Sequence, residues 1–104
     1  MMSNKKGVVM DIKTILSKIR EYKELHPQYK IDEIGIFGSY ARGEANNNSD
    51  IDVYIKLQKS NLFLLSKIRI ELEEIFGKKV DLIQVRDRMN KFLKNSIQKE
   101  SISA

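Results

Sequence analysis

Three aspartates stand at positions where a carboxylate is unusual. Asp50 and Asp52 open the segment 50–57, in which apolar and polar residues alternate as in a half-buried strand, and Asp81 lies inside an apolar stretch. Aspartate is depleted in strands, and two carboxylates on one strand face repel each other. If the two strands are neighbours, all three carboxylates converge. A cluster of oxygen ligands without histidine or cysteine suits Mg²⁺ or Mn²⁺.

Each of these aspartates also has a purely structural explanation. Asp50 and Asp52 follow an asparagine-rich turn, so they could mark the solvent-facing start of a strand. Asp81 could be a charge that keeps an edge strand from pairing with another molecule. A buried, unpaired carboxylate would instead be costly, and burial would favour a bound cation.

Gly38 and Ser39 form a second feature with chemical potential. The residues that follow, 40–42, can make one helical turn that ends at Gly43. Such a turn would direct backbone N–H groups and the Ser39 hydroxyl at a ligand, for which phosphate is the natural candidate, and Gly38 would let the backbone approach it. An ordinary turn capped by Ser39 is the alternative. Arg42 could bind the same phosphates or stabilise the loop through an internal ion pair.

The surrounding hydrophobic pattern predicts helices and strands that would position these residues. Apolar residues at helical spacing predict helices over 12–25, begun by Asp11 and ended near Pro27, and over 62–76, ended by Gly77. The predicted strands are 31–37, 50–57 and 80–85. Met89, Phe92, Leu93 and Ile97 predict a short last helix, capped by Asp87.

This order predicts an α+β fold, with a small mixed sheet of three to four strands and helices packed on one face. The chain has 104 residues, so we expect one domain over residues 1–104. It has no cysteine and a single histidine, His26, which excludes disulfides, thiolate sites and most histidine-dependent triads. Its longest apolar run is only 62–65 and no secretory signal is evident, so a cytoplasmic protein with no membrane partner is expected.

The net charge of +5 admits several explanations. A basic balance is compatible with nucleic acid, with an acidic partner, with a phosphate-rich ligand, or with a solvated lysine-rich surface. Basic residues gather near the C-terminus, but with little aromatic character between them, so nucleic acid is not the expected partner. These residues are Arg86, Arg88, Lys91, Lys94 and Lys99.

Together the two features resemble a known signature. Gly38-Ser39, ten residues, and then Asp50-Ile51-Asp52 resembles the motif of the polymerase-β-like nucleotidyltransferase superfamily, and Asp81 between two hydrophobic residues is similar to its third carboxylate. The fuller stretch 38–53 is similar to the minimal nucleotidyltransferases (MNT), which often pair with HEPN-domain proteins.

This resemblance implies a palm-like fold and a catalytic role for Asp50, Asp52 and Asp81. The three carboxylates would hold two Mg²⁺ ions, with Mn²⁺ as a possible substitute. The resemblance also implies a nucleotide site formed by Gly38, Ser39 and Arg42, with ATP as the most plausible substrate.

The resemblance further implies that the acceptor is supplied by another molecule, because we expect no acceptor-binding domain in so short a chain. In the minimal branch that molecule is a HEPN ribonuclease toxin, and the acceptor can be one of its tyrosine hydroxyls. The protein would then be a protein adenylyltransferase that acts as an antitoxin. Two alternatives stay open, namely a non-catalytic module that binds the toxin and a small nucleic-acid-binding protein. The sequence does not indicate an oligomeric state.

Overall fold

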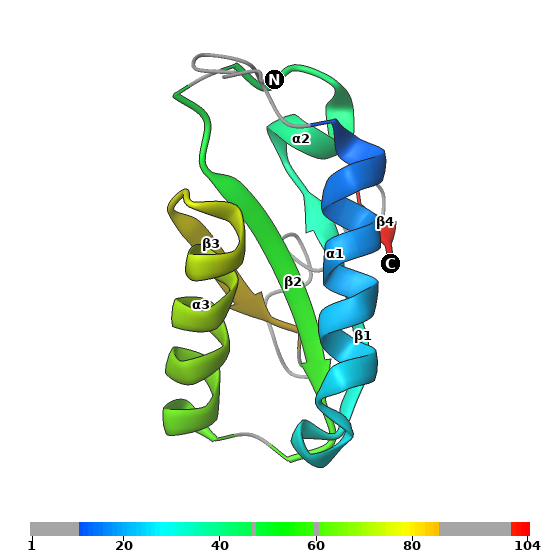
Figure 1. Cartoon of the computed structure of the whole chain (residues 1–104), viewed down its shortest axis with the longest axis vertical. Helices are drawn as coiled ribbons and strands as arrows, with labels where there is room; N and C mark the ends of the chain where they lie inside the picture. Colours follow the sequence, from blue (N-terminus) through cyan, green and yellow to red (C-terminus); the bar gives the residue numbers. More distant parts are fainter. Residues whose placement is uncertain (1–10, 47, 60, 86–100) are drawn as a thin grey trace, which may run out of the picture.

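The computed structural model describes residues 11–46, 48–59, 61–85 and 101–104, and Figure 1 shows the whole chain. The elements are α1 (Ile12–Leu25), a 3₁₀ turn η1 (Pro27–Tyr29), β1 (Ile31–Phe37), α2 (Ser39–Arg42), β2 (Ile51–Leu57), α3 (Leu62–Phe76), β3 (Val80–Gln84) and β4 (Ile102–Ser103). Within these described residues, no helix is both long and apolar enough to cross a bilayer.

The four strands form one mixed sheet in the order β3-β2-β1-β4. Strand β1 is antiparallel to both of its neighbours, β2 and β4, whereas β2 and β3 run parallel. A parallel pair needs a crossover connection, and α3 provides it. Helices α1 and α3 lie over the same face of the sheet, so the expected α+β architecture with helices on one face is confirmed (Figure 1).

The predicted elements agree with the structure in most of the chain. Helices α1 and α3 have the predicted bounds, as does β1, while β2 begins one residue later than predicted and β3 ends one residue earlier. Strand β4 was not predicted. Asp11 occupies the N-cap position of α1, but its side chain makes no capping hydrogen bond. The predicted last helix and its Asp87 cap lie outside the described residues.

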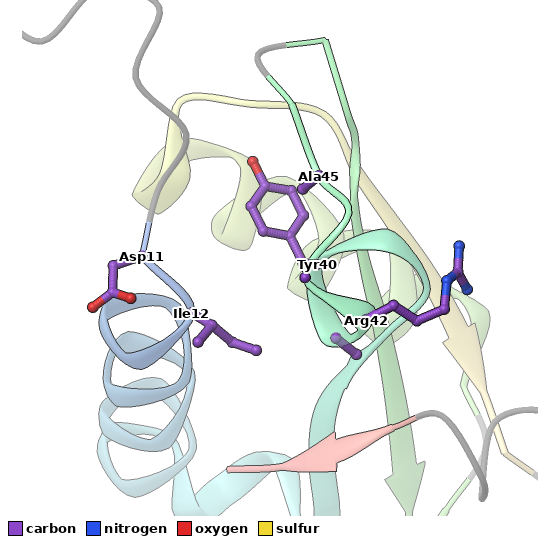
Figure 2. Close-up of a pocket in the computed structure, with 7 residues that line it drawn as sticks. Asp11, Ile12, Tyr40, Arg42 and Ala45 are labelled. Carbon is purple, nitrogen blue, oxygen red and sulfur yellow. The ribbon is translucent and has the colours of Figure 1, made fainter.

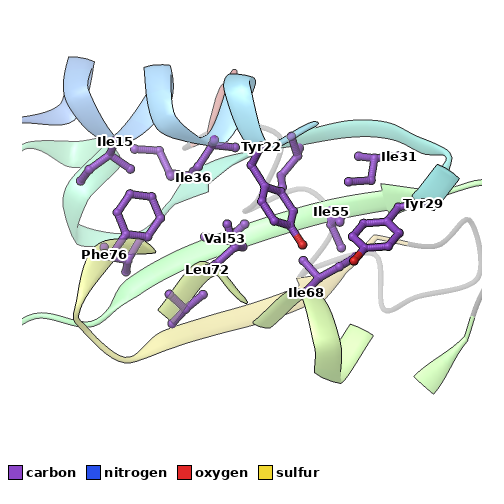
Figure 3. Packing of buried hydrophobic residues seen from close by; sticks show 14 of the residues in the cluster. Ile15, Tyr22, Tyr29, Ile31, Ile36, Val53, Ile55, Ile68, Leu72 and Phe76 are labelled. Atoms are coloured by element: carbon purple, nitrogen blue, oxygen red, sulfur yellow. The ribbon is translucent and has the colours of Figure 1, made fainter. Parts of the chain in front are cut away.

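The hydrophobic core lies between the two long helices and the sheet (Figure 3). Ile15 and Ile19 of α1 and Ile68 and Leu72 of α3 are fully buried against the sheet. Full burial of such a side chain contributes about 1.5–3 kcal/mol, so this layer is the main source of stability. The buried residues of β2 that face the helices alternate along the strand, and they are Ile51, Val53, Ile55 and Leu57.

The same alternation decides where the polar residues of β2 and β3 lie. Successive side chains of a strand point to opposite faces of a sheet. Since Ile51 and Val53 face the helices, Asp52 faces the opposite side, and Asp81 does likewise next to the buried Val80. The sheet therefore presents two of the predicted site residues on the face opposite α1 and α3.

A hydrogen-bonded cluster ties α1 to α3. The Tyr22 hydroxyl donates to Glu71 Oε1 over 2.6 Å, and the Tyr29 hydroxyl donates to the same oxygen over 3.1 Å. His26 stacks on Tyr29 with a centroid separation of 4.8 Å, and its Nδ1–H donates to the Tyr22 carbonyl oxygen over 2.9 Å. His26 thus ends α1 and has a structural role.

Candidate active site

Gly38 ends β1 and begins the short helix α2 in a backbone conformation that favours glycine. Its φ is +74° and its ψ is −147°, a region that is essentially restricted to glycine. A Cβ placed on Gly38 would collide with the Asp52 carboxylate and would stand 3.1 Å from Asp52 Cγ. The turn can therefore lie against this carboxylate only because the residue has no side chain.

Ser39 is the first residue of α2, and Gly38 is its N-cap. The Arg42 amide donates to the Gly38 carbonyl oxygen over 3.0 Å, which closes the helical turn that the sequence predicted. Because Gly38 and not Ser39 occupies the N-cap position, the alternative in which Ser39 caps this turn is wrong. Ser39 is half-buried and directly follows Gly38, the residue that lies against the Asp52 carboxylate.

The register of the sheet brings two of the three aspartates together. In the parallel pair of β2 and β3, Asp52 is the partner of Asp81. Neighbouring strands lie about 4.8 Å apart, so the two side chains leave the same face side by side. The condition set from the sequence, that the two strands are neighbours, is therefore met.

Two further hydrogen bonds fix this register at the start of both strands. The Ile51 amide donates to the Lys79 carbonyl oxygen over 3.1 Å, and the Val80 amide donates to Glu73 Oε2 of α3 over 3.1 Å. Nothing in the sequence marks Glu73 for this contact with the Val80 amide, because the contact depends on how α3 returns to the sheet.

Asp50 lies in the exposed turn directly before β2. It is close enough to Asp52 to influence its ionisation: burial, then the negative charges of Asp81 and Asp50, raise the pKa of Asp52, while the Arg42 guanidinium opposes this rise. The site thus concentrates negative charge that a cation would relieve.

The donor chemistry of these residues fits a hard divalent cation. Asp50, Asp52 and Asp81 offer only carboxylate oxygens, as Mg²⁺ prefers. In the positions shown, the described residues gather no set of three or more histidine, cysteine, aspartate or glutamate side chains that could hold a metal ion. Asp81 is exposed on β3, which is an edge strand, so its predicted role as a ligand stays a prediction.

Arg42 forms an internal ion pair, one of the two roles that the sequence allowed for it. Its Nε donates to Glu44 Oε1 over 2.8 Å. Its charge also acts on the Asp52 carboxyl, where it opposes the rise in pKa that burial and the neighbouring carboxylates cause. Glu44 was not singled out from the sequence, although its place directly after Gly43, at the end of a predicted turn, was a usable signal.

A pocket of about 430 Å³ lies between α2, including Arg42, and the start of α1 (Figure 2). Asp11, Ile12, Tyr40 and Ala45 are among the residues that line it, and none of the three aspartates of the candidate site is. Tyr40 is 3% exposed, and its buried hydroxyl lacks a hydrogen-bond partner among the described residues. Tyr40 thus anchors α2 to the hydrophobic core.

Comparison with known proteins defines the class to which this fold and site belong. The model of the nucleotidyltransferase domain family matches residues 10–104. The chain therefore belongs to the nucleotidyltransferase domain family.

Two proteins of similar sequence have names that are more specific than that of the family. A candidate protein adenylyltransferase of Methanocaldococcus jannaschii is 42% identical over 95 residues, which cover 88% of this chain and 93% of the relative. The protein adenylyltransferase MntA of Thermococcus cleftensis is 36% identical over 90 residues, which cover 86% of this chain and 84% of MntA.

Solved structures share the fold. One described as a minimal nucleotidyltransferase superposes with a TM-score of 0.76 at 27% identity, covering 92% of this chain and 98% of that one. A toxin–antitoxin complex with AMP-PNP has a TM-score of 0.68 at 22% identity, and the match covers 81% of this chain and 69% of that one. A tri-AMPylated Shewanella oneidensis HEPN toxin in complex with MNT antitoxin has a TM-score of 0.66 at 19% identity, and the match covers 88% of this chain and 69% of that one. The last two likenesses concern the fold alone.

Proposed function

We propose that this protein transfers an adenylyl group from ATP to a hydroxyl group of a HEPN-type toxin and thereby acts as an antitoxin. The observation that carries the proposal is the register of β2 and β3, which sets Asp52 beside Asp81 and next to the Gly38 turn. A repulsive pair of carboxylates has no use in a surface that serves only for binding, but it suits the transfer of a nucleotidyl group.

Three carboxylates have the proposed role of metal ligands. Asp50, Asp52 and Asp81 would hold Mg²⁺, as two ions in the pattern of the family, with Mn²⁺ as a substitute. Bound Mg²⁺ would neutralise the polyphosphate and stabilise the charge that develops on the entering and leaving oxygens. The acidic site would then attract the nucleotide instead of repelling it.

The turn at the start of α2 has the proposed role of holding the nucleotide. The backbone of Gly38 can approach a phosphate closely, and the Ser39 hydroxyl can donate a hydrogen bond to it. Arg42 contributes positive charge at the same end of the sheet. The family match, and the AMP-PNP in the name of one structural neighbour, support a nucleotide as substrate.

The proposed reaction balances as a substitution at phosphorus. The acceptor oxygen bonds to the α-phosphorus of ATP, the bond from that phosphorus to its bridging oxygen breaks, and pyrophosphate leaves. The acceptor hydroxyl loses its proton. The face of the sheet opposite α1 and α3, on which Asp52 and Asp81 lie, is where the acceptor would meet the nucleotide.

A HEPN-type partner is supported by the names of proteins to which this chain is similar. One relative is a protein adenylyltransferase MntA, and one structural neighbour is an MNT antitoxin bound to a tri-AMPylated HEPN toxin. A tyrosine of the partner is the proposed acceptor. A cytoplasmic location and one functional unit over residues 1–104 belong to the same proposal.

The position of a radioactive label in ATP tests the proposed chemistry. With Mg²⁺ and a HEPN partner, label in the α-phosphate should become attached to the partner, whereas label in the γ-phosphate should leave as pyrophosphate. Transfer of the γ-label would indicate a kinase. An unlabelled partner that is nevertheless inhibited would indicate binding without catalysis.

A further inference from the structure

Helix α3 presents apolar side chains on the side that faces away from the sheet. Phe63 is 89% exposed and Ile70 is 49% exposed, whereas the buried residues of the helix lie on its opposite side. Phe63, Ser66 and Ile70 follow one another at spacings of three and four residues, so they line one face of the helix. This face continues to Gly77 at the C-cap. We call these four residues the outer seam of α3.

The fold of one copy makes no use of the two apolar side chains in this seam. In the part of the chain that the structure describes, neither Phe63 nor Ile70 belongs to the hydrophobic core or packs against it. A single exposed apolar residue is ordinary on a protein surface. Two of them seven residues apart on one helix, with charged residues on both flanks, form the pattern along which helices pair.

The charges beside the seam change sign along the helix. Lys67 lies on the flank that faces α1 and η1, since its Nζ is 5.6 Å from the centroid of the Tyr29 ring. Glu74 lies on the same flank, where it lines a pocket together with residues of α1. On the other flank Arg69 precedes Glu73, and these two side chains are paired within one copy over 3.3 Å. Both flanks are thus basic toward the start of the helix and acidic toward its end.

This distribution of charge is complementary to a second copy of α3 in antiparallel orientation. With a twofold axis at Ile70, Lys67 lies about 4.5 Å before the axis and Glu74 about 6 Å beyond it, at a rise of 1.5 Å per residue. A twofold axis brings the same flank of both helices together, so each Lys67 faces Glu74 of the second copy. A parallel pair would instead set lysine against lysine and glutamate against glutamate, which is unfavourable.

The side-chain sizes along the seam match in the same orientation. Phe63 and Gly77 lie equally far from Ile70, seven residues before it and seven after it. The ring of Phe63 in one copy therefore meets Gly77 of the second copy, a large residue against a small one. Nothing lies within 4 Å of a Cβ placed on Gly77, which leaves room for this ring.

We propose that two copies of this chain form a homodimer in which the outer seams of α3 pack antiparallel about a twofold axis at Ile70. Asp52 and Asp81 lie on the face of the sheet opposite α3, so they take no part in this contact. The inference is therefore independent of the proposed function. Each copy contributes one helix, which makes the contact small, so we expect a dimer with a Kd of about 1–100 µM.

Sedimentation of the purified protein over a series of concentrations tests the dimer. The wild type should change from the mass of one chain to the mass of two. Ile70→Lys places two like charges at the axis and should raise the dimer Kd about tenfold or more. Leu25→Lys is the matched control, because Leu25 is an apolar residue of α1 that is 67% exposed, and it should associate like the wild type. Since both residues are exposed, each variant should keep the Tm of the wild-type monomer.

Reversal of the flanking charges tests the orientation. Lys67→Glu and Glu74→Lys should each raise the dimer Kd about tenfold, because each sets like charges opposite one another at two symmetric places. The double variant, in which the two charges are exchanged, should associate like the wild type. Losses that add in the double variant would overturn the antiparallel contact.

Disulfide trapping provides a test that does not depend on weakening the dimer. The chain has no cysteine, so a single introduced thiol gives an unambiguous product. Ile70→Cys should form a disulfide-linked dimer under mild oxidation, because the two copies of this residue meet at the axis. Phe63→Cys should not, since its two copies would lie about 21 Å apart along the helices, whereas a disulfide needs Cα atoms within about 7 Å.

Three results would overturn the inference. The first is a wild-type protein that stays monomeric up to about 1 mM, well above the expected Kd. The second is cross-linking of Phe63→Cys as readily as of Ile70→Cys, which would indicate a parallel or random encounter. The third is a monomeric wild type that loses binding to a HEPN partner on Ile70→Lys, because the seam would then belong to that partner.

Discussion

Gly38 meets the Asp52 carboxylate directly, and a matched pair of variants can separate this contact from backbone strain. Gly38→Ala should lose about 1–3 kcal/mol of stability from its conformation and most of the transfer activity, because the new Cβ displaces Asp52. Gly77 also has a positive φ, +64°, but nothing lies within 4 Å of a Cβ placed there. Gly77→Ala should therefore lose about 1–2 kcal/mol of stability and keep its activity per folded molecule. Equal activity in both variants would show that the contact with Asp52 is not needed.

Asp52 is expected to reduce stability while it supports function. Its raised pKa means that the ionised carboxylate, present at neutral pH, is less favourable in the folded protein than in the unfolded chain. Asp52→Asn removes this charge, so the free energy of unfolding at pH 7 should stay the same or rise. The rate of transfer should fall about 10²–10⁴-fold. A variant that keeps its rate, or that unfolds more easily, would contradict this account of Asp52.

Ser39 is expected to matter for the nucleotide and not for the fold, because Gly38 and not Ser39 is the N-cap of α2. Ser39→Ala removes one hydrogen bond to phosphate and should cost about 1–3 kcal/mol of transition-state stabilisation, less than Asp52→Asn. Transfer rate and Tm measured on the same preparation test this. A large fall in Tm would mean that the hydroxyl serves the fold.

Some residues of the site could be predicted from sequence and others could not. Asp52 and Asp81 could be predicted because the alternation of side chains along a strand assigns each residue to one face of the sheet. Neighbouring strands then bring residues on the same face together. Glu44 and Glu73 act through contacts that depend on the path of a loop and on the return of α3. Such tertiary contacts leave no periodic pattern in a single sequence.

At the scale of elements, the Glu71 cluster between α1 and α3 predicts a dependence of stability on pH. The Tyr22 hydroxyl, more than any other group, lowers the pKa of Glu71 from its ordinary value of 4.5. A lowered pKa in the folded state stabilises the protein above pH 4.5, and this contribution disappears as the pH falls through the folded value.

The Glu71→Gln variant tests this cluster. The variant should lose stability at pH 7, and the acid side of its stability profile should be flatter than that of the wild type. Tyr22→Phe should cost about 1–2 kcal/mol at pH 7 for the lost hydrogen bond to a charged group. Glu74→Gln, an exposed neighbour on α3, is the matched control. Denaturant unfolding at several pH values provides the measurement, and parallel profiles for wild type and Glu71→Gln would refute the role of Glu71.

Some helices and strands could be predicted from the sequence more completely than others. Long amphipathic helices such as α1 and α3 have a repeated pattern and clear end signals, so their bounds agree with the prediction. Strand β4 has only two residues, Ile102 and Ser103, and cannot show a period of its own. It pairs with β1 at Gly35, where a side chain would collide with the backbone of residues 102 and 103. This close approach is visible only in three dimensions.

At the scale of the whole molecule, the described residues place Asp52 and Asp81 on one face of the sheet and the helices α1 and α3 on the other. Catalysis and partner docking would then use different residues. Asp50→Asn should abolish transfer to a HEPN partner while the complex between the two proteins still forms, which co-purification can check. Loss of the complex together with activity would show that the acidic site is part of the docking surface.

The mass of the intact partner tests the central claim most directly. After incubation of the two proteins with ATP and Mg²⁺, mass spectrometry of the HEPN partner should show the addition of one or more adenylyl groups, and pyrophosphate should be released in equal amount. The addition should be absent with Asp50→Asn. An unmodified partner in the presence of the wild-type protein, with the complex formed and ATP bound, would contradict the account.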